Sequence, residues 1–286
     1  MFLYIYSLCG WGYWGLFSTI ITEMILFITL LLVLLLFVWM QSTKVRFVKE
    51  HSDASGYDVL TCLNEFEVQH TLHLIENKKY HELQHVIQNN PRVLQEIARV
   101  LGPDYVFQDY VLSIEKSAIS TCHRDENGKM FNGQTHPAYT ILFFLEPMHA
   151  CLDVIRGSHR RRDFINVSHP LESVPCTPGQ AILFDADLIH SGSINEGGGD
   201  HRRVQMKLIH KDDVGKIPQF DNYHKLIDAS KSTSTWYTKF VRNVSCTFTG
   251  VADVTKNGQN MPEFVKTLYK HVAYGGGDKY MLHNLR

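Results

Sequence analysis

The segment PGQAILFDADLIHSGSIN, residues 178–195, contains a Pro-Gly turn, a short apolar run and a histidine that follows a second turn. The apolar run at residues 180–184 has the length and the preceding turn of a buried β-strand. Gly, Pro or Asn residues separate further runs of this kind, which cover residues 105–114, 139–145, 151–155 and 203–210. Short strands without intervening helices favour a β-sandwich or jelly roll over a βαβ fold.

Helical patterns flank this β-rich region. Residues 63–101 show helical spacing of apolar positions, and their last helix has Asn90 as its N-cap, Pro91 at its first position and Gly102 after its end. Residues 262–272 predict one more amphipathic helix. The predicted fold is therefore mainly β with flanking helices.

Composition narrows the functional classes. The 286 residues are 44% hydrophobic and 20% charged, which is ordinary for a folded protein, and the net charge of −1 provides no general attraction for nucleic acid. The six cysteines form no CxxC pair, which excludes a zinc ribbon or a thioredoxin-type motif. Their even number permits disulfides, but their scattered spacing favours free thiols in a reducing compartment.

The sequence contains three His-x-Asp pairs, and their surroundings separate them. His51-Ser-Asp53 has no strand before it, and His210-Lys-Asp212 has no suitable histidine after it. His123-Arg-Asp125 follows a predicted strand, and His190 lies downstream of it. Two histidines and one carboxylate can occupy one triangular face of an octahedral Fe(II) ion, which leaves three positions open. We therefore expect His123, Asp125 and His190 to bind iron.

A basic residue about twelve positions after the second histidine can hold the far end of a dicarboxylic co-substrate. Arg202 and Arg203 both satisfy this spacing. Side chains alternate between the two faces of a strand, and we take the apolar face with Val204, Met206 and Leu208 as the inside of the barrel. Arg202 shares the parity of that face, so we expect it to point inward, with Arg203 as the alternative.

Two segments resemble a known family. Residues 151–159, CLDVIRGSH, look like the G-x-L-x-V-x-P-G-S-H segment of the phytanoyl-CoA dioxygenase-like family, and residues 178–195 are similar to that family's strand and distal histidine. The resemblance covers roughly residues 90–210. Arg156 stands where the family usually has Pro, and Ala150 stands where it usually has Gly.

The resemblance implies a double-stranded β-helix, which is a cupin-like jelly roll. It also implies Fe(II) on His123, Asp125 and His190, with 2-oxoglutarate and O₂ as co-substrates and Arg202 at the C5 carboxylate. Related halogenases lack the carboxylate ligand, so the presence of Asp125 favours hydroxylation. The expected substrate is a small molecule or a lipid.

The N-terminal region predicts a membrane anchor. Residues 24–40 are uniformly apolar, and extension toward the N-terminus gives a span at about residues 20–40, close to the roughly 20 residues that a bilayer requires. No Lys or Arg precedes Lys44, which argues against a cleaved signal peptide. The cations Lys44, Arg46 and Lys49 favour a single-pass protein with a cytosolic catalytic domain. Two placements are open for residues 1–21, which either lie in the membrane interface or form a second short span.

These patterns predict an anchor at residues 1–41, a linker at 42–62 and a dioxygenase domain at 63–286. The jelly-roll core would cover about residues 104–212, and a helical extension would cover 213–286. Two other functions remain open. A prolyl-4-hydroxylase-like enzyme usually has Lys in place of Arg, and Lys207 lies seventeen positions after His190. The third reading is a jelly-roll binding module without catalysis.

Overall fold

The computed structural model describes most of the chain between residues 53 and 216 and shorter segments on either side. The described residues are 20–35, 46–47, 53–109, 111–114, 122–125, 134–161, 163, 165–166, 169–193, 201–216, 223–227, 236–249 and 280–284. The chain divides into two units, residues 1–43 and residues 44–286.

The first unit contains a helix over residues 20–35. The prediction of a membrane-spanning helix over residues 20–40 is wrong, because no helix within the described ranges is long and apolar enough to cross a membrane. The predicted single-pass membrane location, with its cytosolic catalytic domain and its membrane partner, is wrong on the same finding. Residues 1–19 and 36–40, which the sequence analysis also assigned to the anchor, lie outside the described residues.

In the second unit, residues 65–101 form three successive helices. They are α2 (Glu65–Glu76), α3 (Tyr80–Gln88) and α4 (Pro91–Leu101). Asn64 caps α2 in a capping box with Glu67. The predicted signals at α4 are confirmed, since the Asn90 side chain accepts from two backbone amides of the first turn and Gly102 follows the last turn with a φ of 88°. A glycine accepts this positive φ without steric cost.

Eight strands form the larger of two sheets. Its order is β12-β11-β4-β10-β5-β8-β2, and β3 pairs with β10 beside this path. The strands are β2 (Tyr57–Thr61), β3 (Tyr105–Phe107), β4 (Val111–Ile114), β5 (Tyr139–Phe144), β8 (Gln180–Asp185), β10 (Arg203–His210), β11 (Tyr223–Ile227) and β12 (Tyr280–Asn284). The strand β10 is central because it pairs with β3, β4 and β5.

The smaller sheet has four strands in the order β1-β7-β6-β9. These strands are β1 (Arg46–Phe47), β6 (Leu152–Val154), β7 (Glu172–Val174) and β9 (His190–Gly192). Short 3-10 helices η1 (Asp53–Ser55), η2 (Ser158–Arg160) and η3 (Lys211–Asp213) lie in the connections.

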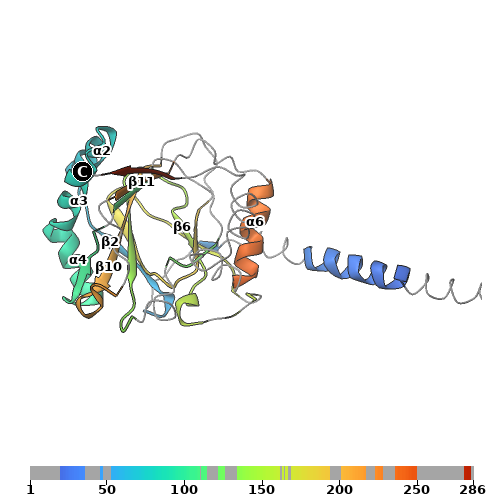
Figure 1. Cartoon of the computed structure of the whole chain (residues 1–286). Coiled ribbons are helices and arrows are strands. Elements are labelled where there is room, and N and C mark those ends of the chain that lie inside the picture. Colours follow the sequence, from blue (N-terminus) through green and yellow to red (C-terminus); the bar gives the residue numbers. More distant parts are fainter. Residues whose placement is uncertain are drawn as a thin grey trace, which may run out of the picture. The chain divides into compact units, whose positions relative to one another are not determined.

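The two faces of the larger sheet have different neighbours. One face joins α2, α3 and α4 in a single apolar cluster, through Ile141, Phe143, Leu183, Val204 and Met206. The opposite face joins β6 and β7 of the smaller sheet in a second cluster, through Leu112, Leu142, Phe144, Ile182 and Phe184. Figure 1 shows the three helices along the outer side of the larger sheet and β6 beyond its other side. The space between the two sheets is the interior of the barrel, and the arrangement is consistent with the predicted jelly roll.

Two regions differ from the domain organisation that the sequence predicts. Residues 57–61 fall in the predicted linker, but they form β2 and pair with β8 throughout their length. The predicted helical extension contains α6 (Trp236–Thr247), but it also contains the strands β11 and β12, which pair with each other and extend the larger sheet from β4. The helix predicted at residues 262–272 lies outside the described residues.

Candidate metal centre

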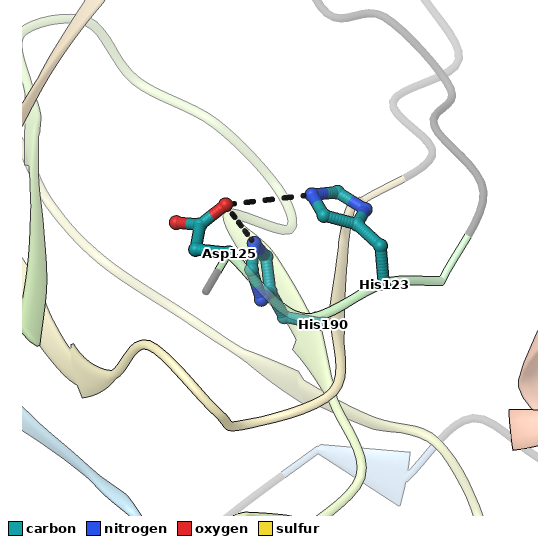
Figure 2. A group of neighbouring side chains, drawn as sticks. All are labelled: His123, Asp125 and His190. Carbon is teal, nitrogen blue, oxygen red and sulfur yellow. Dashed lines mark ion pairs between the residues drawn. The ribbon is translucent and has the colours of Figure 1, made fainter. Parts of the chain in front are cut away.

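The side chains of His123, Asp125 and His190 converge between the two sheets. Asp125 Oδ1 lies 3.6 Å from His123 Nε2 and 3.7 Å from His190 Nε2. Figure 2 shows both imidazoles turned toward the same carboxylate oxygen. One ligand atom from each residue lies within 4.8 Å of the other two. Asp125 and His190 are buried, and His123 is partly exposed.

Backbone pairing places the three residues side by side. His123 and His190 form an antiparallel bridge in which each amide donates to the other carbonyl at 2.9 Å. Two residues later, the amide of Asp125 donates to the carbonyl of Ala186 at 2.7 Å. Residues more than 60 positions apart are thus aligned by main-chain hydrogen bonds, which hold their Cα atoms in register.

The tautomer of His190 is set by a main-chain group. Its Nδ1 lies 2.9 Å from the carbonyl oxygen of Leu188. A carbonyl oxygen only accepts, so Nδ1 carries the proton and Nε2 keeps its lone pair. That lone pair is on the nitrogen that faces Asp125, as a metal-binding histidine requires.

The second carboxylate oxygen of Asp125 is held by the inner face of the larger sheet. Thr140 Oγ1 donates to Asp125 Oδ2 at 2.6 Å, and Gln205 Nε2 donates to the same oxygen at 3.3 Å. Oδ1 therefore stays directed toward the two histidines. The sequence offers one signal for these two supports, since Gln205 lies two residues after Arg203 and therefore shares its face of the strand.

The residue between the two ligands, Arg124, is fully buried. Its guanidinium donates to the carbonyl oxygens of Ser158, Asp187 and Arg161. These three main-chain acceptors fix the turn that carries His123 and Asp125. Loss of this side chain would leave buried carbonyl groups without donors, which is costly.

A disulfide joins Cys122, the residue before His123, to Cys246 in α6. The expectation that all six cysteines are free thiols is therefore wrong for this pair, because the fold brings together residues 124 positions apart. The amide of Cys122 also donates to Ser245 Oγ. On the other side of the site, Arg242 of α6 donates to Ser191 Oγ, next to His190. The helix α6 thus contacts the neighbours of both histidines. Cys62, Cys151 and Cys176 are free and buried.

The two arginines at the start of β10 point to opposite faces. Arg202 shares the parity of Val204, as predicted, but that face packs on the helices and not on the barrel interior. Its guanidinium binds Glu146 at 2.6 Å and Glu76 at 2.6 Å. The predicted inward orientation of Arg202 is therefore wrong: the apolar face of β10 is the outer face, because helices cover it.

Arg203 lies on the inner face, like Gln205. It is buried, and its Nη1 has no hydrogen-bond partner among the described residues. Burial lowers the pKa of Arg203 to about 10, and the Cys151 thiol only partly offsets this effect. A buried cation without a carboxylate partner is unfavourable. An anionic ligand that reached this guanidinium would relieve that cost.

The remaining His-x-Asp pairs are placed differently. His51 lies outside the described residues. His210 and Asp212 lie at the end of β10 and in η3, and His136 lies next to them. These three residues form a second group that shares no member with the first.

The first group fits a divalent metal ion in its chemistry and its spacing. Metal bonds to nitrogen and oxygen donors are roughly 2 Å long, which places neighbouring donors about 3 Å apart. The measured separations of 3.6 and 3.7 Å are slightly larger than this. Two imidazole nitrogens and one carboxylate oxygen form the facial set of non-haem Fe(II) enzymes, which leaves the opposite positions open.

A comparison with known protein families gives a match over a large part of the chain. The family model described as Phytanoyl-CoA dioxygenase (PhyH) matches residues 39–204, which is more than half of the chain. No curated protein sequence matches the chain.

Several solved structures resemble part of this chain. The non-haem monooxygenase ThoJ in complex with nickel is 16% identical, with a TM-score of 0.45 over 55% of this chain and 74% of that one. The α-ketoglutarate-dependent epimerase SnoN from nogalamycin biosynthesis is 16% identical, with a TM-score of 0.45 over 55% and 78%. HygX from Streptomyces hygroscopicus with nickel and 2-oxoglutarate bound is 16% identical, with a TM-score of 0.44 over 55% and 82%.

Proposed function

The chain belongs to the phytanoyl-CoA dioxygenase (PhyH) family, and from this premise we propose that it is an Fe(II)- and 2-oxoglutarate-dependent dioxygenase that hydroxylates a small organic substrate. The observation that carries the proposal is the convergence of His123, Asp125 and His190, with one ligand atom from each inside 4.8 Å. The co-substrates are 2-oxoglutarate and O₂. Bound iron supplies the activation of O₂ that is coupled to the oxidative decarboxylation of 2-oxoglutarate.

The protein's own contribution is to hold three donors in one geometry. His190 presents Nε2 because Leu188 fixes the proton on Nδ1. Asp125 presents Oδ1 because Thr140 and Gln205 occupy Oδ2. These contacts restrict the rotation of both side chains before any ion binds, which lowers the entropy that binding must remove.

We assign the far carboxylate of 2-oxoglutarate to Arg203. The guanidinium is on the inner face of β10, on the same side as Gln205, which contacts Asp125. A planar guanidinium can bind a carboxylate through two parallel hydrogen bonds. Arg202 remains the weaker candidate, because Glu146 and Glu76 already bind its guanidinium.

The proposal that the reaction is a hydroxylation rests on the carboxylate of Asp125. Halide transfer in related enzymes needs a vacant ligand position where that carboxylate would be. Here the position is filled, and Thr140 holds the carboxylate in place at 2.6 Å. An incoming halide would have to displace a buried, hydrogen-bonded anion, which is unfavourable.

The test is the release of succinate from 2-oxoglutarate by the purified full-length chain. We expect turnover that requires added Fe(II) and that falls to background in His123→Ala and in Asp125→Ala. The matched control is His81→Gln, an exposed histidine of α3, which should leave turnover unchanged. Folded wild-type protein that neither binds Fe(II) nor consumes 2-oxoglutarate would contradict the proposed enzymatic function. That result would favour the alternative of a non-catalytic binding module.

A second experiment identifies the substrate from the product that the reaction forms. Extracts of cells that express the wild type and cells that express Asp125→Ala are compared by mass spectrometry. A hydroxylase predicts a product that is heavier than its precursor by one oxygen atom and that is present only with the wild type. A product that carries a halogen, or an isomer of unchanged mass, would contradict hydroxylation while leaving the iron centre intact.

A further inference from the structure

Outside the proposed iron centre, a second cluster of metal-binding side chains lies at the end of the β5–β10 pair. His210 is the last residue of β10, Asp212 is in η3, and His136 lies three residues before β5. One ligand atom from each of the three lies within 4.8 Å of the others. The pair His210-Lys-Asp212 has no suitable histidine after it in the sequence, but the fold brings His136 to it from earlier in the chain.

Two paired strands, β10 and β3, give His210 a rigid base. His210 pairs with Tyr105 of β3, and the two rings meet edge to face with centroids 5.4 Å apart. Tyr105 Oη donates to the carbonyl of Pro137, and the amide of Lys211 donates to the carbonyl of Asp104. A ligand that is mounted on paired strands keeps its position better than one on a free loop.

His136 is held by the neighbouring carboxylate of Asp213. Asp213 Oδ2 accepts from the amide of His136 at 2.8 Å and lies 3.5 Å from His136 Nδ1. Asp213 Oδ1 also accepts from Thr135 Oγ1 at 2.6 Å and from Lys216 Nζ at 2.9 Å, so the carboxylate is itself held in place. A fixed carboxylate beside a ring nitrogen is the arrangement that orients metal-binding histidines in known sites.

The donors of His210 and Asp212 are already close. His210 Nδ1 lies 3.5 Å from Asp212 Oδ2 and accepts a long hydrogen bond of 3.3 Å from the Asp212 amide. The rings of His136 and His210 are stacked, with centroids 3.6 Å apart. An ion at roughly 2 Å from each donor would replace the long hydrogen bond and tilt the rings out of the stack.

We propose that His136, His210 and Asp212 form a second site, for a divalent ion of the zinc class. Imidazole donors select zinc, nickel and copper over magnesium and calcium, which prefer oxygen donors alone. The side chains of His136 and Asp212 are 37% and 69% exposed, so water has access and the ion exchanges with solvent. A bound ion ties η3 and the segment before β5 together at the end of the barrel.

The experiment measures Zn²⁺ stoichiometry on the metal-free, full-length chain by equilibrium dialysis and elemental mass spectrometry. We expect about two equivalents for the wild type and about one equivalent for Asp125→Ala, because the two sites share no ligand. His210→Gln in the Asp125→Ala background should remove the remaining equivalent, and His136→Gln should do the same. His81→Gln in that background is the matched control and should retain it.

A second readout separates loss of the site from loss of the fold. Saturating Zn²⁺ should raise the Tm of Asp125→Ala and leave the Tm of Asp125→Ala/His210→Gln unchanged. His210→Gln alone should keep iron-dependent succinate release, since His210 is outside the proposed iron centre. A single equivalent in the wild type that Asp125→Ala loses, or an equivalent in Asp125→Ala that survives both histidine substitutions, would overturn the second site. Neither result depends on whether the chain turns over 2-oxoglutarate.

Discussion

Thr140 Oγ1 donates a 2.6 Å hydrogen bond to Asp125 Oδ2, and both side chains are buried. Thr140 belongs to β5, which pairs with β10, so the hydroxyl comes from the inner face of the same sheet that carries Gln205. This contact makes the sheet a part of the proposed iron centre, because it decides which oxygen of Asp125 faces the two histidines.

Thr140→Val keeps the shape of the side chain and removes the hydroxyl. The contact from Thr140 is then lost, while the longer 3.3 Å contact from Gln205 to Asp125 Oδ2 remains. We expect the affinity for Fe(II) to fall by about 10-fold or more, as is usual when a partner of a metal ligand is lost. Isothermal titration with Fe(II) under anaerobic conditions measures this. The control is Ser113→Ala, a buried hydroxyl of β4 that has no hydrogen-bond partner among the described residues. Equal affinities for wild type and Thr140→Val would contradict the positioning role.

Arg203→Gln and Arg202→Gln distinguish the two faces of β10. Removal of the buried charge at Arg203 should raise the KM for 2-oxoglutarate by about 10- to 100-fold, the usual loss for a charged hydrogen bond. Iron affinity should not change. Arg202→Gln should leave the KM near the wild-type value, because its guanidinium binds Glu146 and Glu76 on the outer face.

Steady-state kinetics at varied 2-oxoglutarate concentration decide whether Arg203 or Arg202 binds this co-substrate. A raised KM in Arg202→Gln with a normal KM in Arg203→Gln would reverse the assignment. Lys207 is also on the inner face and is buried. If Lys207→Met were the only one of these substitutions to raise the KM for 2-oxoglutarate, the alternative of a prolyl-4-hydroxylase-like enzyme would be favoured.

The ion pair between Glu146 and Arg202 predicts a pH-dependent contribution to stability. Burial acts to raise the pKa of Glu146, but hydrogen bonds and the charge of Arg202 lower it below its usual value. A lowered folded-state pKa stabilises the protein above the unfolded pKa, about 4.3 for Glu, and this contribution is lost as pH falls through the folded pKa.

Glu146→Gln should therefore lower the free energy of unfolding by about 1 kcal/mol at pH 7, with a difference from wild type that shrinks below about pH 4. Urea denaturation across this pH range measures it. The control is Glu82→Gln, whose pair with Lys79 is exposed on both sides and should contribute almost nothing. A difference that grows as pH falls would have the wrong sign for this interaction.

Cys246→Ser removes the disulfide to Cys122. The bond closes a loop across 124 positions, so its loss should lower the free energy of unfolding by about 2 to 5 kcal/mol. Because Cys122 precedes His123, iron affinity should fall as well. Dithiothreitol should reproduce both effects in the wild type and add nothing in Cys246→Ser. Alkylation of both cysteines in native protein before any reductant is added would show that the bond is absent.

The sequence predicts most of the fold because its signals are local. Alternating apolar residues and turn dipeptides identify β5, β8 and β10, and capping residues identify both ends of α4. The strand β2 is missed because residues 57–61 carry no strong pattern by themselves and become a strand only by pairing with β8. The disulfide is missed for the same reason, since only the packing of α6 brings Cys246 to Cys122.

The two arginines show a different limit of sequence reasoning. Strand parity separates Arg202 from Arg203, but it does not say which face is inside. Both faces of β10 are buried, one under helices and one in the barrel, so the apolar face with Val204 and Met206 is not a marker of the interior. The second face is recognised only from its contacts, such as that between Gln205 and Asp125.

The groups that orient His190 and Asp125 differ in how easily a mutation removes them. His190 is oriented by the carbonyl of Leu188, a group that every amino acid carries, so substitutions at position 188 leave this acceptor in place. Asp125 is oriented by the side chains of Thr140 and Gln205, and one codon change can remove either. Genetic drift in this chain should therefore impair the carboxylate ligand before the histidine. Because Leu188 is itself buried in the core, the comparison is between conservative changes: Leu188→Ile should retain iron affinity, whereas Thr140→Val should lower it.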